Sequence, residues 1–197
     1  MRILSARRQF LADHSSTNYL FFAAKPLSKE ARAVVSRLSS HVDVHPRRAT
    51  ITYNFEGADL DEARRLKFLE HYDVEVREDY DWWALSVMLE KARLEVDLSK
   101  YTTEGEASLT FEECGARVRL RLEGTHLDYN AAYHEFGEDI MEGMAELGLA
   151  LRDEVYDGQV DALAVIERYC DANTILSDKR GNPTPVGKTL RQLLDPL

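Results

Sequence analysis

Residues 69–90 read LEHYDVEVREDYDWWALSVMLE and decide the fold of this chain. The pattern predicts the end of a helix, a strand over residues 73–78, an acidic turn, and a second strand that carries both tryptophans of the protein. In each strand the apolar residues alternate with other residues, so they share one face: Val74 and Val76 in the first, and Trp83, Leu85, Val87 and Leu89 in the second. We therefore expect the hydrophobic core to form around this hairpin.

Upstream of the hairpin, the sequence predicts two units that each consist of a strand and a helix. Residues 18–24, NYLFFAA, form an apolar run typical of a buried strand, and Ser28 is a candidate N-cap for the helix that follows. Residues 48–55 alternate as a half-buried strand does. Asp59 and Glu62 then have the spacing of a capping box at the start of a second helix.

Downstream of the hairpin, the hydrophobic period first stays at two and then changes to that of a helix. Alternating runs centred on Val96, Leu109 and Leu120 predict three further strands in a β-meander, which makes about seven strands in all. After Gly124 an amphipathic helix is predicted over residues 132–155. A second helix follows it, and Thr184 with Pro185 has the form of an N-cap and first turn for a last short helix.

Together these elements predict an α+β protein. We expect a mixed or antiparallel sheet with two N-terminal helices, a β-meander and a helical C-terminal part. Residues 1–125 would form the α/β sheet domain, and residues 126–197 an acidic helical subdomain packed on the first. The C-terminal part holds 14 acidic and 6 basic residues, so it carries most of the net charge of −10.

Composition limits the classes of function. A chain of 197 residues with 44% hydrophobic residues can bury a core without a metal or disulfide, and Cys114 and Cys170 lie too far apart in sequence to suggest a zinc knuckle. The acidic balance disfavours nucleic acid and anionic membranes as partners. No apolar run is long enough for a signal sequence or a membrane span. We expect a cytoplasmic protein with reduced cysteines and no cofactor.

Two groups of residues are candidates for binding a protein partner. Arg117, Arg119 and Arg121 share one face of the last predicted strand, where guanidinium groups can bind carboxylates or phosphates. Trp82 and Trp83 point to opposite faces of their strand, so one belongs to the core and the other is either covered by a helix or exposed as an anchor. The alternative for the arginines is that acidic residues of neighbouring strands pair with them: Glu95, Asp97 and Glu112.

The acidic turn of the hairpin offers a second hypothesis, a divalent metal site. Hard cations prefer several oxygen ligands. The candidate ligands are Glu75, Asp79, Asp81 and His71. A metal-dependent hydrolase or nuclease would be the corresponding enzyme, although a solvated aspartate-rich turn explains the same residues. No serine, cysteine or histidine stands in a recognisable catalytic spacing, and the sequence leaves open whether the protein is an enzyme.

Several short motifs resemble a family of uncharacterised bacterial and archaeal proteins. They are SSTNY at residues 15–19, KPL at 25–27, LSS at 38–40, and the Tyr72-Asp73 and Asp81-Trp82 pairs of the hairpin. This sequence departs from the family pattern at His41, where the family has arginine, and at Trp83, where it has glycine. The resemblance implies a common fold and a common partner, and it carries no established activity.

From these observations we expect a non-catalytic interaction protein, with a regulatory or accessory role. The binding surface would be the aromatic and arginine-bearing face of the sheet or the acidic helix. The metal-dependent enzyme is the alternative.

Overall fold

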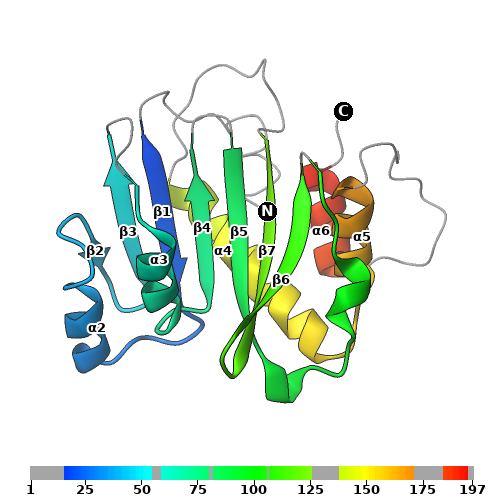
Figure 1. Ribbon diagram of the computed structural model, residues 1–197, viewed down its shortest axis with the longest axis horizontal. Helices are drawn as coiled ribbons and strands as arrows, with labels where there is room; N and C mark the ends of the chain where they lie inside the picture. The colour runs from blue at the N-terminus through cyan, green and yellow to red at the C-terminus, as the bar shows by residue number, and fades with distance from the viewer. Residues whose placement is uncertain are drawn as a thin grey trace.

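Seven strands form one sheet in the order β2-β3-β1-β4-β5-β7-β6 (Figure 1). The computed structural model describes residues 16–54, 59–79, 82–105, 107–125, 138–170 and 184–194. The strands are β1 (Thr17–Phe22), β2 (Asp43–Val44), β3 (Arg48–Tyr53), β4 (Val74–Glu78), β5 (Trp82–Glu90), β6 (Ser108–Cys114) and β7 (Arg117–Thr125). The α-helices are α2 (Lys29–Val35), α3 (Glu62–Leu69), α4 (Glu138–Tyr156), α5 (Asp161–Cys170) and α6 (Pro185–Leu194).

The prediction of an α+β protein is confirmed, and its finer arrangement needs correction. All the described strand pairings are antiparallel. The two early helices each follow a strand, α2 after β1 and α3 after β3, and both lie between strands of the one sheet. Within the part of the chain that the structure describes, no helix is both long and apolar enough to cross a membrane.

The predicted meander is wrong in its strand order. After β5 the chain forms two 3-10 turns, η2 (Lys91–Arg93) and η3 (Leu98–Tyr101), where a strand over residues 94–98 was expected. Asp97 explains the difference, because its carboxylate accepts a hydrogen bond from the backbone N–H of Ser99 and starts a turn. The chain then enters β6 at the far edge of the sheet, and β7 returns to pair with β5.

The sheet separates two hydrophobic cores. On the back face in Figure 1, the core strands pack against α4, α5 and α6. On the front face, α2 and α3 cover only the first half of the sheet, and the ring of Phe21 stacks on that of Phe68 with centroids 4.4 Å apart. The hairpin of residues 74–90 contributes Val74, Val76 and Trp83 to the back core, as its alternation predicts.

Local capping follows the predictions in two of three helices. The Ser28 hydroxyl accepts a hydrogen bond from the backbone N–H of Ala31 at 3.1 Å, and Thr184 caps α6 by accepting from the N–H of Gly187 at 3.0 Å. At α3 the N-cap is Asp61, two residues later than predicted.

Helix α4 lies across the back of β4 and β5 and shares one buried cluster with the sheet (Figure 1). Glycine at position 148 permits a close approach, because a Cβ there would lie only 3.1 Å from the Val74 side chain and 3.2 Å from those of Leu85 and Val87. Arg152 of α4 also pairs with Asp73 at 3.1 Å. Residues 126–137 lie outside the described residues, so the predicted domain boundary after residue 125 stays a prediction.

The close packing at Gly148 predicts a loss of stability when a side chain is added. The Gly148→Val variant should lose about 2 kcal/mol of unfolding free energy, because the helix must move off the sheet. Glu146→Val puts the same residue on an exposed position of the same helix and should cost about 0.5 kcal/mol or less. Urea denaturation of both variants measures the difference, and equal losses would contradict close packing at position 148.

Candidate binding face

Beyond α3, the front face of the sheet is polar. We use the name polar face for the front side chains of β4, β5 and β7 together with two residues of α3: Glu75, Arg77, Trp82, Ser86, Arg119, Arg121, Glu123, Glu62 and Arg65. These residues alternate with the apolar residues of the back core, as strand geometry requires. Among the described residues, no α-helix lies in front of β5 and β7 (Figure 1).

A buried ion pair joins α3 to the sheet. The Arg65 guanidinium donates two hydrogen bonds to the Glu75 carboxylate, at 2.6 and 2.9 Å, and the two residues are only 3% and 1% exposed. A third bond from Arg65 reaches Glu62 at 2.8 Å. Burial alone would lower the pKa of Arg65, but the Glu75 and Glu62 carboxylates outweigh it and raise that pKa above its ordinary value.

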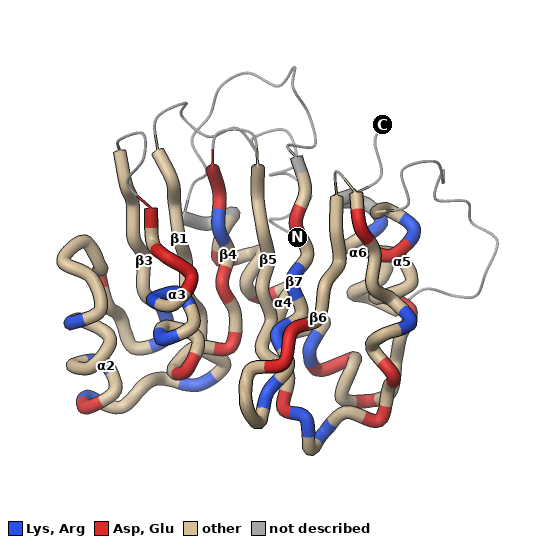
Figure 2. The backbone as a smooth tube through the Cα atoms, in the orientation of Figure 1, with Lys and Arg blue, Asp and Glu red and all other residues tan. Residues whose placement is uncertain are grey.

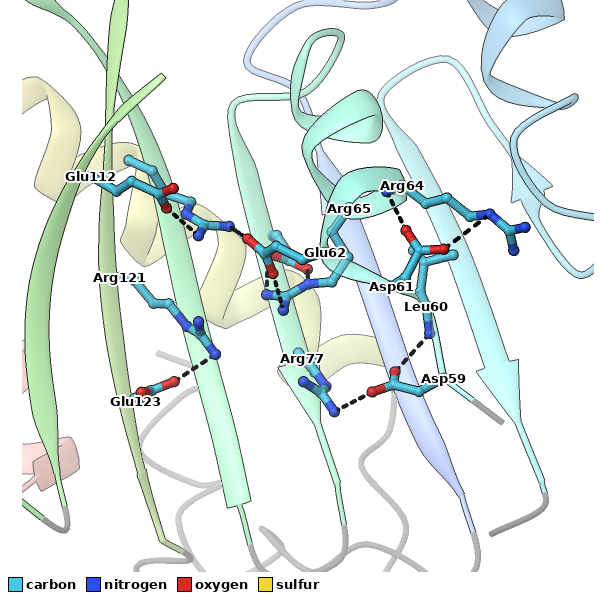
Figure 3. Close-up of polar contacts among 12 residues, drawn as sticks. Asp59, Leu60, Asp61, Glu62, Arg64, Arg65, Arg77, Glu112, Arg121 and Glu123 are labelled. Carbon is cyan, nitrogen blue, oxygen red and sulfur yellow. Dashed lines mark hydrogen bonds and ion pairs between the residues drawn. The ribbon is translucent and has the colours of Figure 1, made fainter. Parts of the chain in front are cut away.

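The chain of charges continues across the sheet to its edge. Arg119 contacts both Glu62 of α3 and Glu112 of β6, two carboxylates that are labelled in Figure 3. Arg117 donates to the backbone carbonyl of Leu69, the last residue of α3. Glu112 is thus one of the acidic neighbours that the sequence offered for the arginines. Asp97 instead pairs with Lys100 at 3.5 Å.

Arg121 is the most weakly compensated arginine of the polar face. Its single ion pair among the described residues is with Glu123, at 2.7 Å. Burial, followed by the neighbouring charges of Arg65 and Arg119, lowers the pKa of the Arg121 guanidinium despite the attraction of Glu123. An additional negative charge beside Arg121 would therefore be favourable.

Trp82 stands between two guanidinium groups. Arg77 lies over its ring at 4.4 Å from the centroid and Arg121 at 5.6 Å. Arg77 is held in turn by Asp59 at 2.8 Å and by Asp79 at 3.3 Å. Trp82 is half-buried on the polar face, whereas Trp83 is 1% exposed in the back core. The tryptophans point to opposite faces, as predicted, and Trp82 is the one that solvent reaches.

Of the four candidate metal ligands, Glu75 and Asp79 are engaged in ion pairs and Asp81 lies outside the described residues. Both carboxylate oxygens of Glu75 accept from Arg65, and Asp79 pairs with Arg77. Asp81 is not among the described residues, and His71 is half-buried just after the end of α3. In the described ranges no three residues of the types His, Cys, Asp and Glu group together as a metal site would require. The metal hypothesis stays a prediction.

The polar face includes residues that sequence reasoning did not single out for binding. The sequence could have placed Arg77 on this face, because Arg77 alternates with the valines of β4. It could also have drawn attention to Ser86, the one hydroxyl-bearing residue in the apolar run of β5. No sequence pattern places Arg65 on this face, because nothing in the sequence indicates that α3 lies over β4. Its partner Glu75 was considered only as a metal ligand.

The fold and this face define a class: an α+β protein whose antiparallel sheet is covered on one side and partly open and charged on the other. Comparisons with known protein families, curated proteins and solved structures find no match. The resemblance to the bacterial and archaeal family therefore stays a prediction.

Removal of one partner from the buried pair predicts a large loss of stability. Glu75→Gln should cost about 3 kcal/mol of unfolding free energy, because Arg65 keeps a buried charge without its counter-ion. Glu112→Gln, whose side chain is 53% exposed, should cost less than about 1 kcal/mol. Urea denaturation tests both. If the double variant Arg65→Met/Glu75→Leu were no more stable than Glu75→Gln, the unpaired charge would not be the cause of the loss.

Glu62 gives a pH dependence of stability. Burial opposes its ionised form, but Arg65, Arg119 and Arg121 outweigh this and hold the pKa of Glu62 below its ordinary value of 4.5. A group with a lowered folded pKa stabilises the protein above its unfolded pKa, and this contribution disappears as the pH falls through the folded pKa.

The stability difference between the natural protein and the Glu62→Gln variant should therefore be largest at neutral pH and shrink below about pH 4.5. Urea denaturation at a series of pH values between 7 and about 3 measures it. Glu70→Gln, at the exposed end of the same helix, is the matched comparison. A difference for Glu62→Gln that grew on acidification would have the wrong sign for this explanation.

Proposed function

We propose that the protein is a non-catalytic interaction protein, with a regulatory or accessory role, and that it binds a protein partner through the polar face. The observation that carries this proposal is the position of Trp82, half-buried between two guanidinium groups on the uncovered part of the sheet. Tryptophan and arginine are the residue types that most often dominate binding energy at protein interfaces. A partner would bury the remaining exposed surface of the ring.

The side chains of the polar face are already ordered before a partner binds, which also favours this face as the binding surface. Arg65 and Arg119 are almost fully buried and are held by carboxylates on both sides, so the neighbours of Arg121 are already fixed. Side chains that are ordered before binding lose little conformational entropy when a partner arrives. A carboxylate or other anion of the partner would add an attractive charge beside Arg121, whose one ion pair among the described residues is with Glu123.

The acidic helix α4 is a weaker choice for the binding surface. Its apolar side packs on the back of the sheet, and Glu142 is paired with Arg48 of β3. Glu146 and Asp153 of α4 are exposed, but Asp153 is already paired with Arg152 of the same helix at 3.1 Å. The side chains of Glu138 and Asp139 are not described.

Nucleic acid is a poor partner for the polar face. Basic and acidic residues are interspersed along α3, β4 and β7 (Figure 2), and the net charge of the chain is −10. A phosphate backbone requires a contiguous basic surface. The location of the protein in the cytoplasm is part of the same proposal.

Two substitutions on the polar face test the proposal. Affinity capture with the full chain identifies partners, and each partner is then purified and its affinity measured by calorimetry. Trp82→Ala and Arg121→Glu should each weaken binding about tenfold or more, because they remove the aromatic anchor and reverse the weakly compensated charge. Arg117 and Arg119 are unsuitable for this test, since both support the fold.

The matched control is Arg64→Glu, on the exposed side of α3. It makes the same charge change as Arg121→Glu but lies outside the polar face. A partner that bound both polar-face variants as tightly as the natural chain would show that binding occurs elsewhere.

A further inference from the structure

The two edges of the sheet carry opposite charge. The strand order places β2 at one edge and β6 at the other. Residues 25–48, which include α2 and β2, hold six basic and two acidic residues, for a net charge of +4. Residues 90–114, which include η2, η3 and β6, hold seven acidic and three basic residues, for −4. We call these segments the basic end and the acidic end (Figure 2).

The basic end is a connected unit whose cations mostly lack carboxylate partners. The backbone N–H of Leu27 donates to the carbonyl of Pro46 at 2.6 Å, which joins the loop before α2 to the turn before β3. Among the described residues, this end takes part in two ion pairs, His45 with Asp43 and Arg48 with Glu142. The basic side chains left without an ion pair in that part of the chain are those of Lys25, Lys29, Arg32, Arg37 and Arg47.

The acidic end shows the opposite imbalance. The backbone N–H of Thr103 donates to the carbonyl of Leu109 at 2.9 Å, so the segment after η3 lies beside β6 at the edge of the sheet. The cations near this end are already paired with Asp97, Glu112 and Glu113. The carboxylates that stay exposed without a basic partner among the described residues are those of Glu90, Glu95 and Glu104.

The two ends cannot neutralise each other within one chain. Seven strands at a spacing of about 4.8 Å separate the two edges by about 29 Å. The Debye length at physiological ionic strength is only about 8 Å, so attraction across the sheet is screened. Each end therefore presents its charge to other molecules.

We propose that the protein self-associates head to tail, with the basic end of one copy bound to the acidic end of a second copy. The two ends have equal and opposite charge, so each is complementary to the other. A two-fold symmetric contact at either end would instead bring like charges together. A head-to-tail contact leaves one end of each copy free, so the contact can repeat into a ring or a filament.

Uncovered groups at both ends support a contact there. In β6 the backbone N–H and C=O groups of Phe111 and Glu113 point away from β7, as those of Leu109 do, and make no hydrogen bond with other described residues. Such an edge is a template for contact with another chain. At the basic end, Val34 of α2 is 47% exposed, and it is the one exposed large apolar side chain among the described residues.

Sedimentation velocity of the full chain over a range of protein concentrations tests this association. At about 20 mM sodium chloride the average mass should rise with concentration, and at about 500 mM it should fall to that of the monomer, because salt screens the contact. A chain that stays monomeric at low salt would overturn self-association. Binding of polyglutamate or a nucleic acid to such a monomer would assign the basic end to another partner.

Two double variants test the head-to-tail arrangement. Lys25→Gln/Lys29→Gln neutralises part of the basic end, and Glu95→Gln/Glu104→Gln part of the acidic end. All four side chains are exposed, so the melting temperature should not change. Each variant should self-associate about tenfold more weakly than the natural chain, because two attractive charges are lost.

An equal mixture of the two variants gives the sharpest result. Each variant retains the end that the other lacks, so the mixture should form a heterodimer and grow no further. The matched control is Lys67→Gln/Lys188→Gln, which removes two exposed lysines outside both ends and should associate as the natural chain does. A mixture that stays monomeric, or a control as weak as the end variants, would overturn the arrangement. So would association that Trp82→Ala abolishes and the end variants leave unchanged.

Discussion

The buried ion pair between Arg65 and Glu75 is the interaction on which the polar face depends. It fixes α3 over β4 and thereby brings Glu62 within reach of two arginines at once. From there Arg119 continues the chain of charges to β6, so one helix is connected to the far edge of the sheet. Charges can stay buried only when they are paired and hydrogen-bonded. Each member therefore holds its neighbour in place, and the network behaves as a unit.

This network explains why the two faces of one sheet differ so much. The back face follows the ordinary solution for an α+β protein, with apolar side chains covered by helices and α4 drawn close at Gly148. On the front, α2 and α3 are short and cover only the strands at one end (Figure 1). The remaining strands carry charged side chains that cover one another, so α3 ends the apolar core and begins the polar face.

The sequence predicted what depends on local pattern and missed what depends on tertiary contact. Alternation in residues 74–90 assigned Trp83 to the core, and the hydroxyls of Ser28 and Thr184 marked two helix starts correctly. Alternation alone cannot tell a strand from an irregular segment packed at the edge of a core, and for this reason residues 94–98 were predicted wrongly. Strand order also has no local signal. The partnership of Arg65 with Glu75 was unforeseeable, although the two residues are only ten positions apart.

The stability of the fold does not explain the choice of serine at position 86. Its neighbours along β5 are all apolar, and its hydroxyl is buried without a hydrogen bond, so alanine would suit the fold at least as well. The Nε atoms of Arg77, Arg119 and Arg121 likewise make no hydrogen bond among the described residues. Local features that disagree with an otherwise consistent fold tend to mark functional sites.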